Sequence, residues 1–185
     1  MTPHVCPWWL GYFLASPLRR LVENPNKLLD GLITPGMTVL DVGCAMGFFT
    51  MPAARMVGSS GRVIAVDIQP KMISALRRRA KRRGLLDRIE TRVGTEQGLG
   101  LSDLASKVDL VLAIHMVHEV PDRDRLMSEL CRAVKHTGKM LIVEPKGHVK
   151  AAAFAETVAA AERAGFRAID LFSAKRGHSR LFVKA

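Results

Sequence analysis

From residue 38 onward, short apolar runs alternate with segments of helical periodicity, and this alternation limits the fold more than any other feature of the sequence. The run at 108–115, VDLVLAIH, is almost uniformly apolar, which is typical of a parallel strand buried on both faces. Strands are expected at 38–42, 61–67, 88–93, 108–115, 139–144, 166–172 and 179–184. Helices are expected at 18–30, with an interruption at the NPN of residues 24–26, and at 47–57, 70–84, 121–135 and 151–164.

The order of these elements predicts an α/β fold of the Rossmann-like, doubly wound type. The sheet has seven strands and is mostly parallel, with helices on both faces. A short basic loop joins the last two strands, which favours antiparallel pairing of the C-terminal strand. Ligands of such sheets bind beyond the carboxyl ends of the strands. The candidate segments are therefore 41–47, 67–68, 94–97, 115–119 and 144–146.

The length of 185 residues predicts one domain, with an N-terminal helical or lid segment at 1–30 and the core of the domain at 31–185. The three cysteines, Cys6, Cys44 and Cys131, are odd in number and form no C-x-x-C motif, so we expect neither disulfides nor structural zinc. We expect the chain to be cytoplasmic. Its oligomeric state stays open.

The N-terminal stretch VCPWWLGYFLAS, residues 5–16, is apolar but too short to span a bilayer, and no positive charges precede it. We expect this stretch to fold back onto the domain, with Trp8, Trp9, Tyr12 and Phe13 covering a ligand or packing in the core. The alternative is peripheral contact with a membrane surface through residues 5–16.

The formal net charge of +11 favours anionic partners without identifying them. Six cations crowd the end of the helix expected at 70–84: Arg77, Arg78, Arg79, Lys81, Arg82 and Arg83. One interpretation is a solvated face whose cations complement the helix C-terminus. The other is a surface for RNA or an acidic partner.

The stretch VLDVGCAMGFFT, residues 39–50, runs from a strand through a glycine-bearing turn into a helix. Gly43 and Gly47 are present, but Ala45 and Phe48 replace the second and third glycines of the dinucleotide fingerprint, and no Gly-Lys-Ser/Thr ending follows. Asp41 ends the first strand and Asp67 ends the second, where a carboxylate can accept hydrogen bonds from ribose hydroxyls. This chemistry suits a ligand with a ribose and an ammonium group but no phosphates, such as S-adenosylmethionine.

The order of four motifs resembles that of class I S-adenosylmethionine-dependent methyltransferases. The similarity spans Leu28 to the C-terminus and is greatest to the broad group that includes small-molecule and quinone methyltransferases. The motifs are VLDVGCAMGFFT, VIAVDIQPKMI, VDLVLAIHMVHEVPD and AVKHTGKMLIVEP. The resemblance implies transfer of a methyl group from S-adenosylmethionine, leaving S-adenosylhomocysteine, to a small anionic or apolar acceptor that the sequence does not identify.

The resemblance also assigns roles to residues by their position in the motifs. Asp41, Gly43 and Gly47 frame the methionyl part, with Cys44 and Ala45 in the same loop. Asp67 binds the ribose and Ile68 covers the adenine. Thr95 and Glu96 stand where the family has an acid that contacts the adenine amine, and His115 is placed near the methionyl tail. The sequence departs from the family at three places. The acid that contacts the adenine amine is missing or displaced, Ala45 replaces a glycine, for which we expect a slightly altered backbone, and His136 and Thr137 stand where the family often has Pro-Gly.

Candidate catalytic residues follow the fourth expected strand: His115, His118 and Glu119. Because methyl transfer requires removal of a proton from some acceptors, we expect His118 to act as the general base. The alternative is that His118 and Glu119 cap and orient the next helix. The spacing H-x-x-H-E does not match the zincin motif, so no metal site is expected.

Three alternative functions stay open. The basic run at 77–83, with Lys175 and Arg176, suits an RNA methyltransferase, although the fourth motif lacks an Asn-Pro-Pro-Tyr element. The small size of the chain suits a non-catalytic S-adenosylmethionine-binding module. Cys44 and Cys6 suit methylation of a metalloid such as arsenite, although buried cysteines more often only pack.

Overall fold

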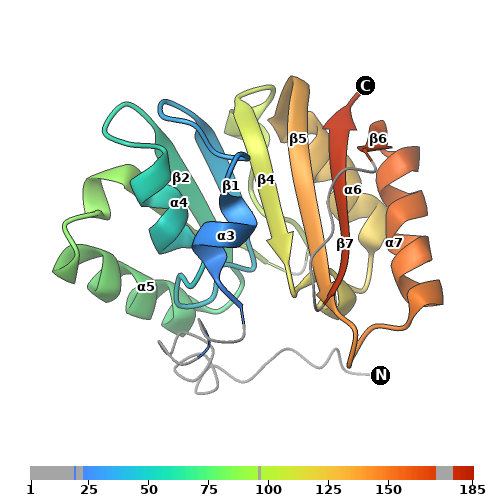
Figure 1. The fold of residues 1–185 in the computed structure, drawn as a ribbon, viewed down its shortest axis with the longest axis horizontal. Coiled ribbons are helices and arrows are strands. Elements are labelled where there is room, and N and C mark those ends of the chain that lie inside the picture. The colour runs from blue at the N-terminus through green and yellow to red at the C-terminus, as the bar shows by residue number, and fades with distance from the viewer. Residues whose placement is uncertain (1–18, 20–22, 96, 170–176) are drawn as a thin grey trace. The chain divides into compact units, whose positions relative to one another are not determined.

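The computed structural model describes residues 19, 23–95, 97–169 and 177–185 (Figure 1). The chain divides into two compact units, which meet in sequence between residues 95 and 96. Several predicted features lie outside the described residues. They are Cys6, the N-terminal cover of Trp8, Trp9, Tyr12 and Phe13, the peripheral segment 5–16, Glu96, and the basic pair Lys175 and Arg176.

In the unit that ends at residue 95, β2 pairs in parallel with β1 on one side and with β3 on the other. Residues Val63–Val66 of β2 are completely buried, which explains why this strand reads as a continuous apolar run. The elements of this unit are α3 (Pro25–Leu29), β1 (Thr38–Val42), α4 (Thr50–Met56), β2 (Arg62–Asp67), α5 (Pro70–Arg82), the 3₁₀ turn η1 (Leu86–Arg88) and β3 (Ile89–Val93).

Helix α5 shows how the sequence determines local structure in this unit. Pro70 occupies the first turn, where its missing N–H costs nothing. The apolar positions at helical spacing, Met72, Ile73, Leu76 and Ala80, are buried, whereas most of the cations between them are exposed. The chain leaves the helix at Gly84, whose φ of +61° suits glycine.

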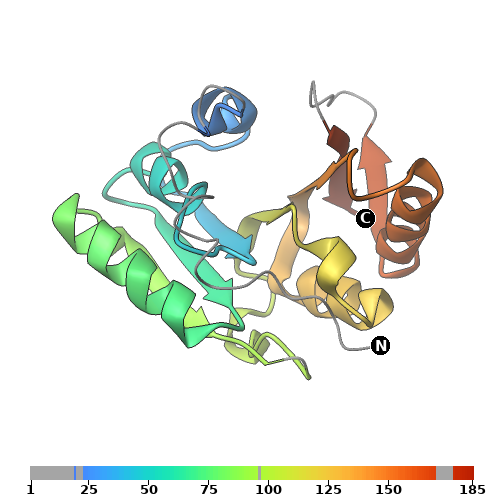
Figure 2. The ribbon, with the colours of Figure 1, turned by 90° about the horizontal axis from the view of Figure 1, so that it is seen from below.

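In the unit that begins at residue 96, β4 pairs in parallel with β5, and β7 runs antiparallel to both β5 and β6. Helices α6 and α7 pack against each other (Figure 2). The elements are η2 (Ser102–Leu104), β4 (Val108–Ile114), η3 (Val117–Glu119), α6 (Arg123–Ala133), β5 (Val134–Pro145), α7 (Ala151–Arg163), β6 (Phe166–Ile169) and β7 (Gly177–Lys184).

The seven described strands follow the order β3-β2-β1 in one unit and β4-β5-β7-β6 in the other. Strand β7 runs antiparallel to both of its neighbours, and the other described pairings are parallel, so the prediction of a mostly parallel Rossmann-like sheet with an antiparallel C-terminal strand is confirmed. Among the described residues, no helix is long and apolar enough to cross a membrane.

Among the described elements, two predicted boundaries are wrong by three residues or more. Helix α4 begins at Thr50 rather than Gly47, because Gly43, Ala45 and Gly47 all have positive φ angles that no right-handed helix accommodates. Strand β5 begins at Val134, directly after α6, rather than at Lys139. The register shifts between Val134 and Lys139, so His136-Thr137-Gly138 belongs to an irregular start of the strand instead of closing the helix.

Candidate functional site

The loop after β1 is built around the buried carboxyl group of Asp41. The hydroxyl of Thr50 donates a hydrogen bond of 2.6 Å to Asp41 Oδ2. Burial raises the pKa of Asp41 to about 7; the Thr50 hydrogen bond opposes this rise, and the charge of Asp67 adds to it. Asp41 is therefore a carboxyl group whose charge a nearby cation would stabilise.

The backbone of this loop is held in place by the end of β2. The N–H groups of Gly43 and Cys44 donate to the Val66 carbonyl at 2.9 and 3.1 Å. Gly43, Ala45 and Gly47 have φ angles of +66°, +46° and +83°. Ala45 thus adopts the left-handed conformation that glycine adopts most easily, at a strain cost of about 1 kcal/mol.

Asp67 ends β2 and fixes the loop through its side chain. Oδ2 accepts the N–H of Ala45 at 2.9 Å, and Oδ1 accepts the N–H of Gln69 at 2.8 Å. Burial raises the pKa of Asp67, and these two hydrogen bonds oppose that rise. Each carboxylate oxygen has a second lone pair, so Asp67 can accept two further donors, such as the two hydroxyls of a ribose.

Other predicted cofactor residues lie close to Asp67 in the sequence or in the sheet. Ile68 follows it directly and is partly buried. The N–H of Gly94 donates to the Asp67 carbonyl at 3.1 Å, which brings the end of β3 and the exposed Thr95 next to the end of β2. The structure therefore gathers Asp41, the glycine loop, Asp67, Ile68 and Thr95 within one unit.

The thiol of Cys44 is buried in the same loop. Burial raises its pKa well above the ordinary value, and the charges of Asp41 and Asp67 raise it further. Because the thiolate is the form that binds metals and metalloids, this environment argues against metalloid capture by Cys44. Within the described part of the chain, no group of three or more His, Cys, Asp or Glu side chains could hold a metal ion.

A second polar group lies in the other unit, where His118 of η3 meets Glu144 near the end of β5. His118 Nδ1 lies 2.6 Å from Glu144 Oε2, and the His118 backbone N–H donates to Glu144 Oε1 at 3.2 Å. Glu144 is only 1% exposed, whereas the His118 side chain is 27% exposed. A buried carboxylate therefore holds an imidazole ring that is partly exposed to solvent.

The carboxylate also favours the protonated form of His118. The hydrogen bond to Glu144 raises the pKa of His118; burial opposes the rise, and the charges of Glu144 and Glu119 add to it. With Nδ1–H donated to Glu144, the neutral ring carries its lone pair on Nε2. The ring of His148 stacks on His118 with centroids 6.4 Å apart. This arrangement suits a proton acceptor at Nε2.

The structure also bears on the other residues that follow β4 and β5 in this unit. His115 follows β4 with a φ of +59°, and its N–H donates to the Val143 carbonyl at 2.7 Å. Asp122 is the N-cap of α6 and accepts the Arg125 N–H at 2.9 Å, so capping of this helix by His118 or Glu119 is wrong. An orienting role of His118 and Glu119 stays a prediction. The sequence places Glu144 only within the candidate segment 144–146, and the apolar run that ends there is the one sequence signal for it.

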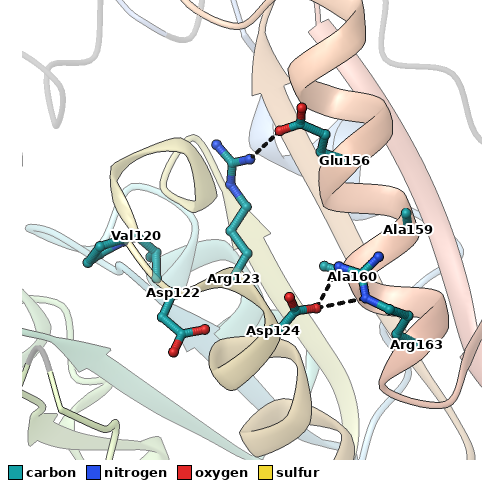
Figure 3. A pocket seen from close by; sticks show the side chains of 9 residues that line it. Val120, Asp122, Arg123, Asp124, Glu156, Ala159, Ala160 and Arg163 are labelled. Atoms are coloured by element: carbon teal, nitrogen blue, oxygen red, sulfur yellow. Dashed lines mark hydrogen bonds and ion pairs between the residues drawn. The ribbon is translucent and has the colours of Figure 1, made fainter.

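A surface groove between α6 and α7 has different chemistry (Figure 3). Ion pairs span the two helices, Arg123 with Glu156 at 3.2 Å and Arg163 with Asp124 at 2.7 Å. None of the side chains that line the groove is aromatic. The charged groups therefore join the helices to each other and offer no stacking surface for an adenine.

Comparison of this chain with known proteins finds similarity to methyltransferases. Residues 33–175 match the sequence profile of a family described as "Methyltransferase domain". The chain is 34% identical over 137 residues to aklanonic acid methyltransferase DauC of a Streptomyces species, covering 74% of this chain and 58% of that protein. It is 32% identical over 119 residues to an arsenite methyltransferase of Halobacterium salinarum, covering 64% of this chain and 29% of that protein.

The matched part thus spans less than two thirds of the length of these relatives. Among solved structures, a SAM-dependent methyltransferase from Aquifex aeolicus superposes with a TM-score of 0.87. It is 24% identical, and the match covers 98% of this chain and 100% of that one. At this identity, the similarity concerns the fold.

Proposed function

Because this chain belongs to the family of class I S-adenosylmethionine-dependent methyltransferases, whose cofactor is S-adenosylmethionine, we propose that it methylates a small-molecule nucleophile. The observation that carries this proposal is the Asp67 carboxylate, which is fixed by two backbone N–H groups and keeps two acceptor positions. A ribose diol is the group that fits such an acceptor pair.

The residues of the loop suit the rest of the cofactor. Asp41 offers a buried carboxyl group to a cationic amino group, with Gly43 and Gly47 shaping the backbone around it. Ile68 offers an apolar surface to the adenine, Thr95 a hydroxyl to its edge, and His115 is assigned to the methionyl tail. When bound, S-adenosylmethionine supplies a methyl group already activated by a positively charged sulfur.

The chain itself supplies the proton acceptor. We assign this role to Nε2 of His118, with Glu144 holding the ring and stabilising the imidazolium that forms. Glu119 adds negative charge beside the ring. Activity should therefore rise with pH through a pKa above the ordinary histidine value, since only the neutral ring accepts a proton. An acceptor with a weakly acidic hydroxyl, such as a phenol or an enol, needs this base most.

The test is transfer of label from methyl-labelled S-adenosylmethionine into a cell extract, followed by separation of small molecules, lipids, RNA and protein. We expect label in the small-molecule fraction. His118→Gln should reduce the rate by about 10²- to 10⁴-fold. His136→Gln, at an exposed histidine of the same unit, is the matched control and should keep the full rate.

Three outcomes would contradict the proposal or the role that it gives His118. Label confined to RNA would favour the RNA methyltransferase alternative. Cofactor binding without transfer into any fraction would favour a non-catalytic module. Equal losses in His118→Gln and His136→Gln would remove the role assigned to His118.

A further inference from the structure

His148 lies beside the assigned base His118, and the proton transfer described above does not use it. It stands in the short loop after β5, where its own N–H and that of Val149 donate to the Pro145 carbonyl at 3.0 and 2.9 Å. Val149 is buried and anchors the loop directly after His148, whereas His148 itself is exposed. A fixed backbone therefore presents an imidazole ring to solvent.

The rings of His148 and His118 are nearly parallel but cover each other little. Their planes differ by 11° and their centroids lie 6.4 Å apart. Rings in face-to-face contact lie only about 3.5–4 Å apart, so the two imidazoles are displaced sideways or separated by a gap. In either arrangement His118 leaves a face of His148 uncovered, and the exposed position of His148 lets a ligand approach that face.

Orientation of the base does not account for His148. Glu144 already holds His118 through the ring Nδ1 at 2.6 Å and through the backbone N–H at 3.2 Å. Among the described residues, the side chain of His148 has no hydrogen-bond or ion-pair partner. Its accessible feature is thus a flat ring, fixed in place next to a proton acceptor.

We propose that His148 selects the methyl acceptor, because its ring stacks on a flat, conjugated ring that carries the hydroxyl to be methylated. A ligand ring on the face of His148 lies parallel to both imidazoles. Beside His118 and level with it, such a ring holds its hydroxyl in the plane of the His118 ring, where the Nε2 lone pair points. Stacking attracts a flat ring to a neutral imidazole, and a cation–π interaction attracts it to a charged one.

Other aromatic groups of this unit fit the role less well. Phe154 of α7 and His178 of β7 form a second stacked pair with centroids 5.4 Å apart, but Phe154 is buried and His178 is only partly exposed. The charged groove between α6 and α7 has no aromatic lining. Among the described side chains of this unit, His148 combines an exposed flat ring with a place beside the base.

The test is a titration with two alcohols on the same carbon skeleton, the flat 2-naphthol and the saturated decahydro-2-naphthol. Binding is followed by NMR of the histidine ring protons, and the His148 signals are assigned from their loss in His148→Leu. We expect 2-naphthol to bind more tightly and to shift the His148 signals upfield, because the ring current of a stacked ring acts on the protons above it. The saturated alcohol has no ring current and no flat face, so it should do neither.

Two variants separate stacking from apolar contact. His148→Leu keeps an apolar side chain without a flat ring and should bind 2-naphthol about 2- to 10-fold more weakly than the wild type. His148→Phe supplies a flat ring again and should restore the affinity. His136→Leu, at an exposed histidine elsewhere in this unit, is the matched control and should bind like the wild type. The pKa of His118 should stay raised in every variant, since each keeps Glu144.

This inference rests on the proposed function, because it takes His118 as the base, but the titration needs no methyl donor. The two can therefore fail separately. Stacking of 2-naphthol on a protein that transfers no methyl group would support the stacking and contradict the proposed function. Four results would overturn the role of His148: equal affinity for the two alcohols, full affinity in His148→Leu, equal losses in His148→Leu and His136→Leu, or no binding of 2-naphthol.

Discussion

Gly47 is the position where a single added methyl group tests the geometry of the cofactor loop. Its φ is +83°, and a Cβ would lie 3.2 and 3.3 Å from Leu76 Cγ and Cδ1 and 3.4 Å from Met51 Cε. Leu76 and Met51 are both buried, so neither side chain can move away into solvent. Gly47→Ala therefore imposes backbone strain and crowding together.

The expected loss of stability follows from these two costs. A left-handed backbone costs an L-residue about 1–2 kcal/mol, and crowding of a packed core adds about 1 kcal/mol. The reduced freedom of the unfolded chain returns about 0.4–1 kcal/mol. The net loss for Gly47→Ala is about 2 kcal/mol, which lowers the melting temperature of a chain this size by roughly 4–8 °C.

Two other glycines separate the two costs. Gly84 has a φ of +61° with nothing within 4 Å of an added Cβ, so Gly84→Ala carries only the backbone cost, about 1 kcal/mol. Gly147 has open space and no positive φ, so Gly147→Ala should change stability little. Urea unfolding followed by circular dichroism measures all three. Equal losses for Gly47→Ala and Gly84→Ala would refute the crowding, and no loss for either would refute the backbone argument as well.

Three further predictions concern titratable groups. Glu144→Gln should lower the pKa of His118, as measured by NMR of its ring protons, and an unchanged pKa would contradict the hydrogen bond. Because the pKa of His118 is raised in the folded protein, the pair stabilises the fold below the ordinary histidine pKa. This contribution is lost as the pH rises through the raised pKa. The pKa of Asp41 is about 7 in the folded protein and near 3.8 in the unfolded chain. The free energy of unfolding of the wild type should therefore fall by roughly 4 kcal/mol between pH 3.8 and pH 7, relative to that of Asp41→Asn. Parallel curves of stability against pH for the two proteins would refute the burial argument. Cys44 should react with iodoacetamide far more slowly in the native protein than in urea, as followed by peptide mass spectrometry; equal rates would show an accessible thiolate.

Local patterns predicted much of the fold correctly. Strand β1 has the predicted bounds of 38–42 because its apolar run is short and a turn precedes it. Helix α5 begins at the predicted Pro70, since a proline and an amphipathic repeat are both readable within a few residues. The start of α4 was not readable, because the left-handed angle at Ala45 depends on a hydrogen bond to Asp67, 22 residues away.

The residues of the candidate site that follow from nearby sequence were also predicted, whereas contacts between residues far apart in the chain were not. Asp41 and Asp67 were predicted because each stands at the end of an apolar strand. The pairing of His118 with Glu144 was not predicted, since it joins residues 26 positions apart through the packing of η3 against β5. The sequence supports His118 as a candidate base, but only the structure supplies the carboxylate that positions it.

The most direct test of the central claim is calorimetric binding of S-adenosylhomocysteine to the wild type and to Asp67→Asn, each compared with an analogue that lacks both ribose hydroxyls. Hydrogen bonds to a charged acceptor contribute about 1.5–3 kcal/mol, so the wild type should bind the hydroxylated ligand about 10- to 100-fold more tightly than the analogue. Asp67→Asn should lose most of this preference, while Asp87→Asn, at an exposed aspartate of the same unit, should keep it. A wild type that fails to bind the ligand, or an Asp67→Asn variant with the full preference for the hydroxyls, would contradict the account.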